Sequence, residues 1–463
     1  KGEKYLRAVQ QHLHPQGCGF LFIPRSSTCL RRIQPLKVFM TEQYSLDLDE
    51  AQFAKMLFDH VREMSKDVAG VTRQGYGPLE TQVLEYLKGI GGKLDLDIQT
   101  DLAGNVWMTL PGTDRTLPAF VSGSHADSVP QGGNYDGLAG IVAALCAAHW
   151  MRRHHYTPKR DFTVLMMRCE ESSFFGKAYV GSLGMMGKLT AADLALKHRS
   201  TGETLGECIR SCGVDPERLT TGEPVIDPKR IAAFVELHIE QGPTLTSQTL
   251  TRTGIVTGIR GNIRHKNVKV LGETAHSGAV NKEYRHDAVM AAARLISRME
   301  DRWQARLDAG DDLVFTVGVI KTAPTAAISV IPGEVSFTVD MRSLSMDTVK
   351  AFHEDLLATA RSLAAERGVR FEFDTPLYTQ PAHVDASLAN RLEASAKRAG
   401  IPVMRLASGA GHDSAVLGNC GIPVAMIFVA NQKGSHNPHE AMELEDFIKG
   451  AELLRHAVED FDL

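Results

Sequence analysis

Hydrophobic positions along the chain follow two patterns, which predict two kinds of folding unit. In the first pattern, four compact apolar runs have the length of strands buried on both faces of a sheet: Ala119–Ser122, Phe162–Arg168, Ala232–Ile239 and Pro423–Val429. Apolar residues at helical spacing predict helices at Leu48–Met64, Leu79–Ile90 and Gly137–Met151. Because strands that alternate with helices usually pair in parallel, these segments predict an α/β fold, a mostly parallel sheet with helices on both faces.

The second pattern runs from about Gly261 to Pro376. It predicts a strand, a helix, two strands, a helix and a strand: Asn267–Gly272, His286–Trp303, Leu313–Lys321, Glu334–Arg342, Met346–Arg367 and Val369–Asp374. This βαββαβ order is typical of a small α+β sandwich. We therefore expect residues 261–376 to form an inserted domain, and residues 40–260 together with 377–463 to form the larger domain around it.

The first 39 residues differ in composition from the rest of the chain. They contain seven lysines and arginines against a single acid, Glu3, and they show no sustained periodicity. We interpret residues 1–39 as a disordered or non-native extension. An organelle transit peptide is the alternative, because such peptides are also rich in arginine and poor in acids.

Composition and charge exclude several classes of protein. The formal net charge of −4 argues against a nucleic-acid partner, which usually requires a basic surface. The seven cysteines lack the regular spacing of a disulfide framework, and no apolar run is long enough to span a bilayer. These features predict a cytoplasmic protein with no membrane partner.

Histidine, aspartate and glutamate gather in five segments where a predicted strand ends or a predicted helix begins. The segments are Gly123–Asp127, Asn134–Gly137, Glu170–Glu171, Glu236–Gly242 and Gly434–Pro438. Taken singly, each is typical of a surface turn or a helix cap. In open α/β sheets, however, the loops at the carboxyl ends of the strands meet at one crevice, where ligands bind. Together the five segments therefore predict a metal site.

The residue types suit a site with two metals. Two divalent ions about 3.5–4 Å apart need one carboxylate that bridges them, and Asp136 is a short side chain held at a turn. Asp127 follows His125 by two residues, so its carboxylate can orient that imidazole. Glu170 is suited to take a proton from metal-activated water and to pass it to the leaving nitrogen. The remaining candidate ligands are three imidazoles and a carboxylate: His125, His238, His436 and Glu171.

These segments resemble the metal-site motifs of the N-carbamoyl-L-amino acid hydrolase, β-ureidopropionase and allantoate amidohydrolase family, which is related to aminoacylases and dinuclear zinc carboxypeptidases. The resemblance extends from about Met40 to the C-terminus, and it is most specific at Glu236–Pro243, where related peptidases usually have Asp in place of His238. It implies two divalent ions per subunit, zinc, manganese or cobalt, and places Glu170 as the general base. The implied ligand sets share one residue: His125, Asp136 and His238, and Asp136, Glu171 and His436.

The resemblance also implies contacts with a small substrate that bears a carboxylate. In the family the small domain dimerises, reaches over the active site, and supplies a histidine and an arginine that match His276 and Arg342. The histidine would stabilise the oxyanion across the dimer interface, and the arginine would bind the carboxylate at two points. Gln241 and Arg264 match further substrate positions. Ser329 stands where the family usually has Asn, and we expect it beside Arg342, so the substrate is left open.

Together with the metal-site pattern, the resemblance implies a homodimeric, metal-dependent amidohydrolase that cleaves the carbamoyl C–N bond of an N-carbamoyl-L-amino acid or a related ureido acid. An allantoate amidohydrolase and an aminoacylase- or dipeptidase-like hydrolase are alternatives on the same scaffold, although His238 disfavours the peptidases. A different class is a binding module that kept the ligands and lost turnover. Glu170 argues against it, because a protein without turnover has no chemical need for the base.

Overall fold

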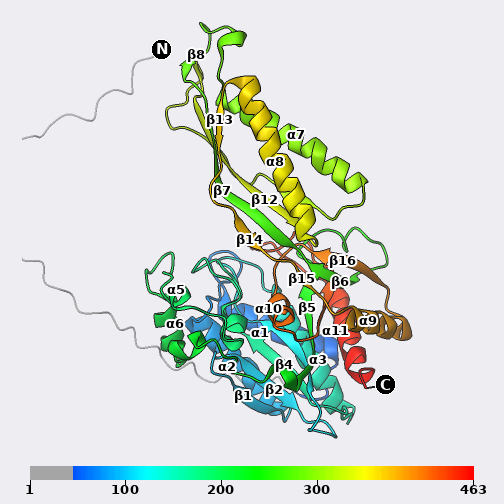
Figure 1. Ribbon diagram of the computed structural model, residues 1–463. Helices are drawn as coiled ribbons and strands as arrows, with labels where there is room; N and C mark the ends of the chain where they lie inside the picture. The colour runs from blue at the N-terminus through cyan, green and yellow to red at the C-terminus, as the bar shows by residue number, and fades with distance from the viewer. Residues whose placement is uncertain (1–44, 463) are drawn as a thin grey trace, which may run out of the picture. The chain divides into compact units, whose positions relative to one another are not determined.

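Two large β-sheets and one two-stranded sheet organise residues 45–462, which are the residues that the computed structural model describes. The prediction for residues 1–39 lies outside this range. The nine-stranded sheet contains β1 (Asp97–Thr100), β2 (Val106–Leu110), β3 (Ala119–His125), β4 (Phe162–Met167), β5 (Ile231–Ile239), β6 (Thr253–Ile259), β15 (Ala382–His383), β16 (Val403–Ser408) and β17 (Val424–Val429). Its strand order is β1-β2-β4-β3-β5-β17-β6-β15, with β16 beside β6 (Figure 1).

The centre of this sheet is parallel. Strand β3 pairs in parallel with both β4 and β5, and β5 pairs in parallel with β17, whereas β1, β2 and β15 add antiparallel edges. All four apolar runs that were predicted as strands lie in this centre. The prediction of a largely parallel α/β sheet is therefore confirmed.

Helices cover both faces of the nine-stranded sheet. One face packs against α1 (Glu50–Ser65), α2 (Pro78–Lys93), α3 (Leu138–Arg153), α9 (Ala386–Ala399) and α11 (Leu444–Glu459). The other packs against α4 (Val180–Met185), α6 (Leu205–Ser211) and α10 (Asp413–Asn419), with α5 (Ala191–Leu194) and the 3-10 turns η1 (Pro216–Thr220) and η2 (Pro228–Arg230) nearby in the chain. Among residues 45–462, no helix combines the length and the apolar character needed to cross a membrane.

The alternation of side chains explains why the central strands are apolar throughout. In β4, Val164 and Met166 belong to the core on one face, while Leu165 and Met167 belong to the core on the other. Successive side chains of a strand point to opposite faces, so a strand covered by helices on both sides needs apolar residues at every position.

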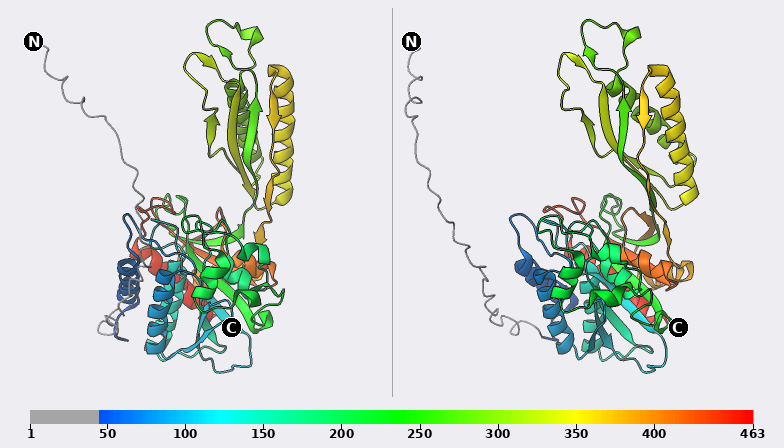
Figure 2. Two further views of the ribbon diagram at one scale, coloured as in Figure 1. Left: turned by 90° about the vertical axis from the view of Figure 1, so that its left-hand side faces the viewer. Right: turned by 60° about the vertical axis from the view of Figure 1, so that its left-hand side comes forward.

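The six-stranded sheet forms a second unit, built from one continuous stretch of chain (Figure 1, Figure 2). Its elements are β7 (Gly261–Leu271), η3 (Lys282–Tyr284), α7 (Ala288–Asp308), β9 (Val314–Thr316), β10 (Ile320–Thr322), β12 (Glu334–Ser343), α8 (Met346–Arg367), β13 (Arg370–Glu372) and β14 (Leu377–Thr379). A small separate sheet pairs β8 (Ala275–His276) with β11 (Val330–Ile331). Helices α7 and α8 pack on one face of the six-stranded sheet, where Ile263 and Met341 are buried.

Some boundaries in this unit agree with the sequence and others do not. Helix α8 spans the predicted residues, because Ser345 caps its first turn and Gly368 ends it in the left-handed conformation. The prediction of a single strand at Leu313–Lys321 was wrong: β9 and β10 are separate short strands, both paired with β12. Gly318 lies at the break, and a glycine inside a strand weakens it and marks a bend.

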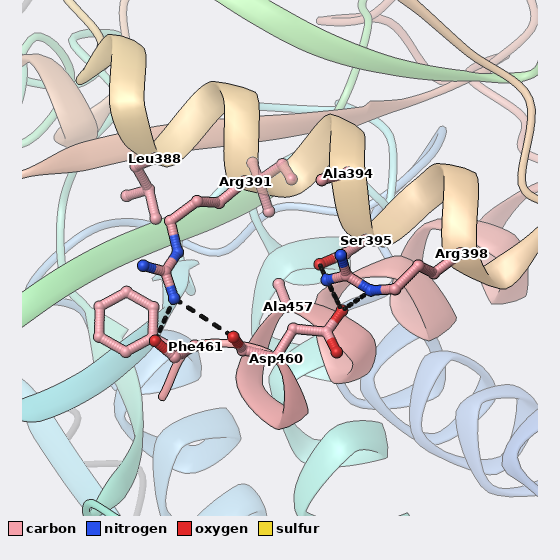
Figure 3. Close-up of a pocket in the computed structure, with 9 residues that line it drawn as sticks. Leu388, Arg391, Ala394, Ser395, Arg398, Ala457, Asp460 and Phe461 are labelled. Atoms are coloured by element: carbon pink, nitrogen blue, oxygen red, sulfur yellow. Dashed lines mark hydrogen bonds and ion pairs between the residues drawn. The ribbon is translucent and has the colours of Figure 1, made fainter. Parts of the chain in front are cut away.

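The end of the last helix is held against α9 (Figure 3). Asp460 accepts a hydrogen bond of 2.6 Å from Ser395 and pairs with Arg398. Arg391 donates to the backbone carbonyls of Asp460 and Phe461, and its guanidinium lies 4.9 Å from the centre of the Phe461 ring. These residues border a cavity of about 400 Å³, and their mutual contacts fasten α11 to α9.

A buried ion pair secures the carboxyl end of β4. Glu80, in α2, accepts hydrogen bonds from Arg168 Nε at 2.6 Å, from Cys169 N at 2.9 Å and from Tyr76 N at 2.8 Å. Glu80 is fully buried and Arg168 is 3% exposed. Each buried charge is stabilised by the other, because removing one partner would leave the remaining charge buried and unpaired.

Replacing Arg168 by methionine should therefore lower the free energy of unfolding by about 3–5 kcal/mol, the usual cost of leaving a buried charge unpaired. The matched control is Arg370→Met, which removes a pair with Glu372 in which both side chains are exposed. Urea denaturation followed by circular dichroism compares the two variants. Equal unfolding midpoints for the two would show that the pair contributes nothing to stability.

Candidate metal centre

Asp136 lies at the centre of a cluster of five potential metal ligands. Its Oδ1 atom is 3.5 Å from His125 Nε2 and 3.1 Å from His238 Nε2. Its Oδ2 atom is 3.3 Å from His436 Nε2, which in turn is 3.0 Å from Glu171 Oε1. The structure thus brings the five predicted ligands together in two groups that share Asp136.

Neighbouring strands explain this convergence. His125 ends β3, His238 lies near the end of β5, and Glu171 and His436 lie in the loops after β4 and β17. These four strands are adjacent in the order β4-β3-β5-β17 and run in parallel, so their carboxyl ends meet at one edge. Asp136 stands in the turn before α3, which packs on β3 and β5.

The spacing and the chemistry of the donors fit divalent metals. Metal–ligand bonds of about 2.0–2.1 Å in a tetrahedral arrangement place ligand atoms about 3.3–3.4 Å apart, close to the separations around Asp136. Imidazole and carboxylate donors suit zinc, manganese and cobalt. Hydrogen bonds to Asp136 and Glu171 raise the pKa of His436 to about 11. The field that holds a proton on this imidazole would equally attract a cation.

Further hydrogen bonds orient Asp136. Glu440 Oε1 accepts from the backbone N–H groups of Tyr135 at 2.8 Å and Asp136 at 3.2 Å, and the Ser435 hydroxyl lies 2.6 Å from Glu440 Oε2. Gln241 Nε2 donates to Asp136 Oδ2 at 2.8 Å. Gln241, predicted as a substrate contact, therefore touches the central carboxylate, while its Oε1 atom is buried and has no hydrogen-bond partner in residues 45–462.

Asp127 connects the ends of two strands. Its carboxylate lies 3.3 Å from His125 Nδ1, which suits the orienting role predicted for it, and it accepts from Glu170 N at 2.9 Å and Glu171 N at 3.0 Å. Glu170 Oε2 lies 4.0 Å from His125 Nε2. Burial raises the pKa of Glu170 well above its usual range, which makes this carboxylate a better proton acceptor near neutral pH.

Arg73 holds together two of the segments that carry the metal centre, and no pattern in the sequence predicts this role. The side chain is completely buried. Its Nε donates to the carbonyl oxygen of Ala126 at 2.8 Å, and its Nη1 donates to Asn134 Oδ1 at 3.1 Å. One guanidinium therefore joins the segment that follows β3 to the segment that contains Asp136.

His412 is a second residue that sequence reasoning missed. Its ring packs edge-on against His238 with centroids 4.5 Å apart. His412, His238 and Glu236 form a third group of possible ligands. However, the two oxygens of Glu236 already accept hydrogen bonds from Ser124 and Ser414, so this group is engaged within the protein. His412 lies between β16 and α10, and it was missed because the apolar pattern predicted no strand at the position of β16.

The two predicted substrate arginines lie together on the six-stranded sheet and share one carboxylate. Arg342 donates to Asp340 through Nε at 3.1 Å and Nη2 at 2.8 Å, and Arg264 Nε donates to the same side chain at 3.1 Å. Arg342 Nη1 also donates to the carbonyl oxygen of Gly409. Two positive charges against one negative charge leave room for one further anion.

His276 lies in β8, within the two-stranded sheet. Its side chain is exposed, and its Nδ1 accepts from Gly278 N at 3.1 Å. Among residues 45–462, the ion pairs of the five ligands join them to one another and to neighbouring carboxylates, and none joins them to His276. The structure therefore does not bring this residue to the cluster of its own chain.

Ser329 does not lie beside Arg342, and that expectation was wrong. Its carbonyl oxygen accepts from Ser277 N at 2.9 Å, next to His276. Strand β12 lies between the two positions. At about 3.3 Å per residue, the eight steps from Glu334 to Arg342 span roughly 26 Å of extended chain.

Comparison with known proteins agrees with the fold and the cluster. A family model described as peptidase family M20/M25/M40 matches residues 121–460. An N-carbamoyl-L-amino-acid amidohydrolase of Paenarthrobacter aurescens is 31% identical over 421 residues, 90% of this chain and 100% of that protein. Allantoate amidohydrolase of Escherichia coli (strain K12) is 31% identical, covering 83% and 91% of the two chains.

A solved structure extends this likeness to three dimensions. The amidase of the hydantoinase/carbamoylase family from Burkholderia multivorans has a TM-score of 0.79 and 29% sequence identity, with 88% of this chain and 97% of that chain covered. The family match includes all five of the segments that carry the candidate ligands and extends over most of the chain. The chain belongs to peptidase family M20/M25/M40, among relatives that are amidohydrolases acting on non-peptide C–N bonds.

Proposed function

We propose that the chain hydrolyses the carbamoyl C–N bond of an N-carbamoyl-L-amino acid or a related ureido acid, with two divalent metal ions per subunit. The observation that carries this proposal is the pair of ligand groups that share Asp136, with one oxygen facing each group. When bound, two such ions activate water and polarise the carbonyl group of the substrate. The amidohydrolases among the relatives support the choice of reaction.

Glu170 is the residue we assign to proton transfer. It is buried at the end of β4 and lies 4.0 Å from the imidazole of His125, so it stands beside the cluster without being one of the five ligands. It takes a proton from the attacking water and delivers it to the nitrogen of the amino acid as the C–N bond breaks. The other product is a carbamate, which decomposes to ammonia and carbon dioxide.

The second sheet supplies the substrate contacts in this proposal. Arg342 and Arg264 share Asp340 and leave one positive charge for the substrate carboxylate. Residues 261–376 would act as a lid and as the dimerisation domain. Because His276 is exposed in β8, at the opposite end of β12 from Arg342, we assign the oxyanion contact to His276 of the partner subunit.

Hydrolysis of allantoate is the second candidate. Allantoate amidohydrolases of Escherichia coli and Bacillus subtilis are 31% and 32% identical to the chain, much the same identity as the N-carbamoyl-L-amino-acid amidohydrolases. Allantoate also carries a carboxylate beside a ureido group, so the same cluster and the same arginines suit it. Comparison of kcat/KM on allantoate and on N-carbamoyl amino acids separates the two.

Removal of metal should abolish activity, and about two zinc, manganese or cobalt ions per subunit should restore it, as expected of a two-metal site. Asp136→Ala should lose both ions, whereas His238→Ala should lose mainly one. His439→Ala is the control, because this histidine is exposed in the same loop as His436. Elemental analysis and turnover are measured on each variant. A fully active metal-free enzyme would refute the metal mechanism.

Glu170 and Glu171 should respond differently to the same substitution. Glu170→Gln keeps the size of the side chain but removes its ability to accept a proton, so kcat should fall by roughly 10²–10⁴ with metal content unchanged. Glu171→Gln should instead lower metal content, because this carboxylate lies 3.0 Å from His436 in the second ligand group. If Glu170→Gln turns over at the native rate, the base is another residue.

The partner contribution of His276 can be tested by complementation. Glu170→Gln and His276→Ala should each be nearly inactive as homodimers. Co-expressed in equal amounts they should recover about a quarter of native activity, because half of the dimers would be mixed and each mixed dimer would contain one intact site. A mixture of Glu170→Gln with Asp136→Ala, which damages the same side of the site in both chains, is the control and should recover nothing. Absence of recovery in the first mixture would place His276 outside the partner's site.

A further inference from the structure

A pocket of about 490 Å³ lies next to the proposed base, a volume typical of small-molecule sites. Ser172, two residues beyond Glu170, contributes to its wall. So does Tyr179, whose backbone N–H donates to the carbonyl oxygen of Glu170 at 2.8 Å. The rest of the wall comes from α4, the end of β6, α10 and the six-stranded sheet. Gly411 of this wall directly precedes His412, whose ring packs on the ligand His238, so the pocket lies beside the metal centre.

The sheet side of this pocket follows from strand alternation. Asn262 and Arg264 are two residues apart in β7 and therefore point to the same face, and Asn262 pairs in register with Arg342 of β12. Ile263, between them, points to the opposite face and is buried under the helices. All three polar side chains line the pocket.

The charged side chains that line the pocket suit a ligand with one anionic group. Among the described residues that line the pocket, four are basic and none is acidic. Arg260 is neutralised by Asp312, with hydrogen bonds of 2.9 and 3.0 Å from its Nε. Arg264 and Arg342 share Asp340, which leaves one positive charge, and Lys188 is exposed to solvent. This balance matches a ligand with one carboxylate, and a second carboxylate would have no buried counter-charge.

Asn262 lines the pocket and carries an acceptor that the described residues do not use. The residue is 6% exposed, and its Oδ1 atom is buried without a hydrogen-bond partner among residues 45–462. Leaving a buried acceptor unpaired costs free energy, and buried polar atoms of this kind are uncommon in native proteins. An N–H group on a ligand would satisfy it.

Tyr179 forms the wall of the pocket on the side of the nine-stranded sheet. It adopts φ of 62°, in the left-handed region that non-glycine residues rarely occupy, and such strain often marks functional sites. Its hydroxyl lies so close to Gly411 that a Cβ atom at position 411 would overlap it. The aromatic ring is thereby fixed in place, and it gives the pocket a rigid wall next to Glu170.

We infer that this pocket binds the side chain of the substrate and selects monocarboxylates whose side chain carries an amide or ureido N–H, with Asn262 as the acceptor. The inference rests on the proposed function for the position of the scissile bond. It narrows the substrate class from N-carbamoyl amino acids in general to those with a polar, uncharged side chain. Asn262 is a specificity-determining residue in this assignment and takes no part in bond cleavage.

The test compares N-carbamoyl-L-asparagine with N-carbamoyl-L-leucine, whose side chains have nearly the same shape but differ in hydrogen bonding. The native metal-loaded enzyme should prefer the asparagine derivative in kcat/KM. Asn262→Leu should reduce that preference by about 10- to 100-fold, the effect of losing a buried hydrogen bond, because kcat/KM for the asparagine derivative should fall further than kcat/KM for the leucine derivative. Asn419→Leu is the matched control, because Asn419 is exposed at the outer edge of the same pocket. This variant should keep the native preference.

A preference for the leucine derivative, or a preference for asparagine that survives Asn262→Leu, would overturn the inference. So would a higher kcat/KM for N-carbamoyl-L-aspartate than for the asparagine derivative, since recognition would then depend on charge. Calorimetric binding of free asparagine and free leucine separates this failure from failure of the proposed function. One outcome would be that no carbamoyl compound is hydrolysed, but free asparagine binds more tightly than free leucine and Asn262→Leu removes the difference. The assignment of the pocket would then hold, and the proposed reaction would be wrong.

Discussion

Seven carboxylates lie buried within the same small region of this fold, and the metal centre depends on balancing their charge. They are Asp127, Asp136, Glu170, Glu171, Glu236, Asp413 and Glu440. Carboxylates this close repel one another and cannot all remain ionised without positive charge among them. Three imidazoles, the buried guanidinium of Arg73 and the proposed metal ions provide that charge. Burying these charges costs free energy of folding, so the cluster is better explained by a catalytic role than by a contribution to stability.

At the strand ends, three non-glycine residues adopt the left-handed backbone conformation, which such residues rarely occupy. Cys169, Gln241 and His436 all have positive φ, at the points where the chain turns from a strand toward the cluster. Hydrogen bonds hold the first two: Cys169 N donates to Glu80, and Gln241 N donates to Asn431. The strain at these turns aims neighbouring side chains at Asp136, so the buried Glu80–Arg168 pair supports the centre as well as the stability of the fold.

Much of the fold and the five candidate ligands could be predicted from the sequence because both depend on local pattern. Apolar runs of strand length define β3, β4, β5 and β17, since strands covered on both faces need apolar residues throughout. Four of the ligands lie at the ends of these strands or in the loops after them, and parallel neighbours bring their carboxyl ends together whatever the details of packing. Asp136 stands instead in the turn before α3, and its place at the start of a predicted helix brought it into the predicted cluster with His125, Glu171, His238 and His436.

The residues that the sequence could not reveal depend on contacts between distant segments. Arg73 meets Ala126 only after folding, and Asn262 meets Arg342 only through the register of β7 and β12. The position of Ser329 was mispredicted for the same reason, because nearness in sequence says little once a long strand runs between two residues. The sequence by itself determined the elements and the chemistry available at their ends. Tertiary structure decided which charges share a partner and which acceptor remains free for a ligand, since those depend on pairing that no local pattern encodes.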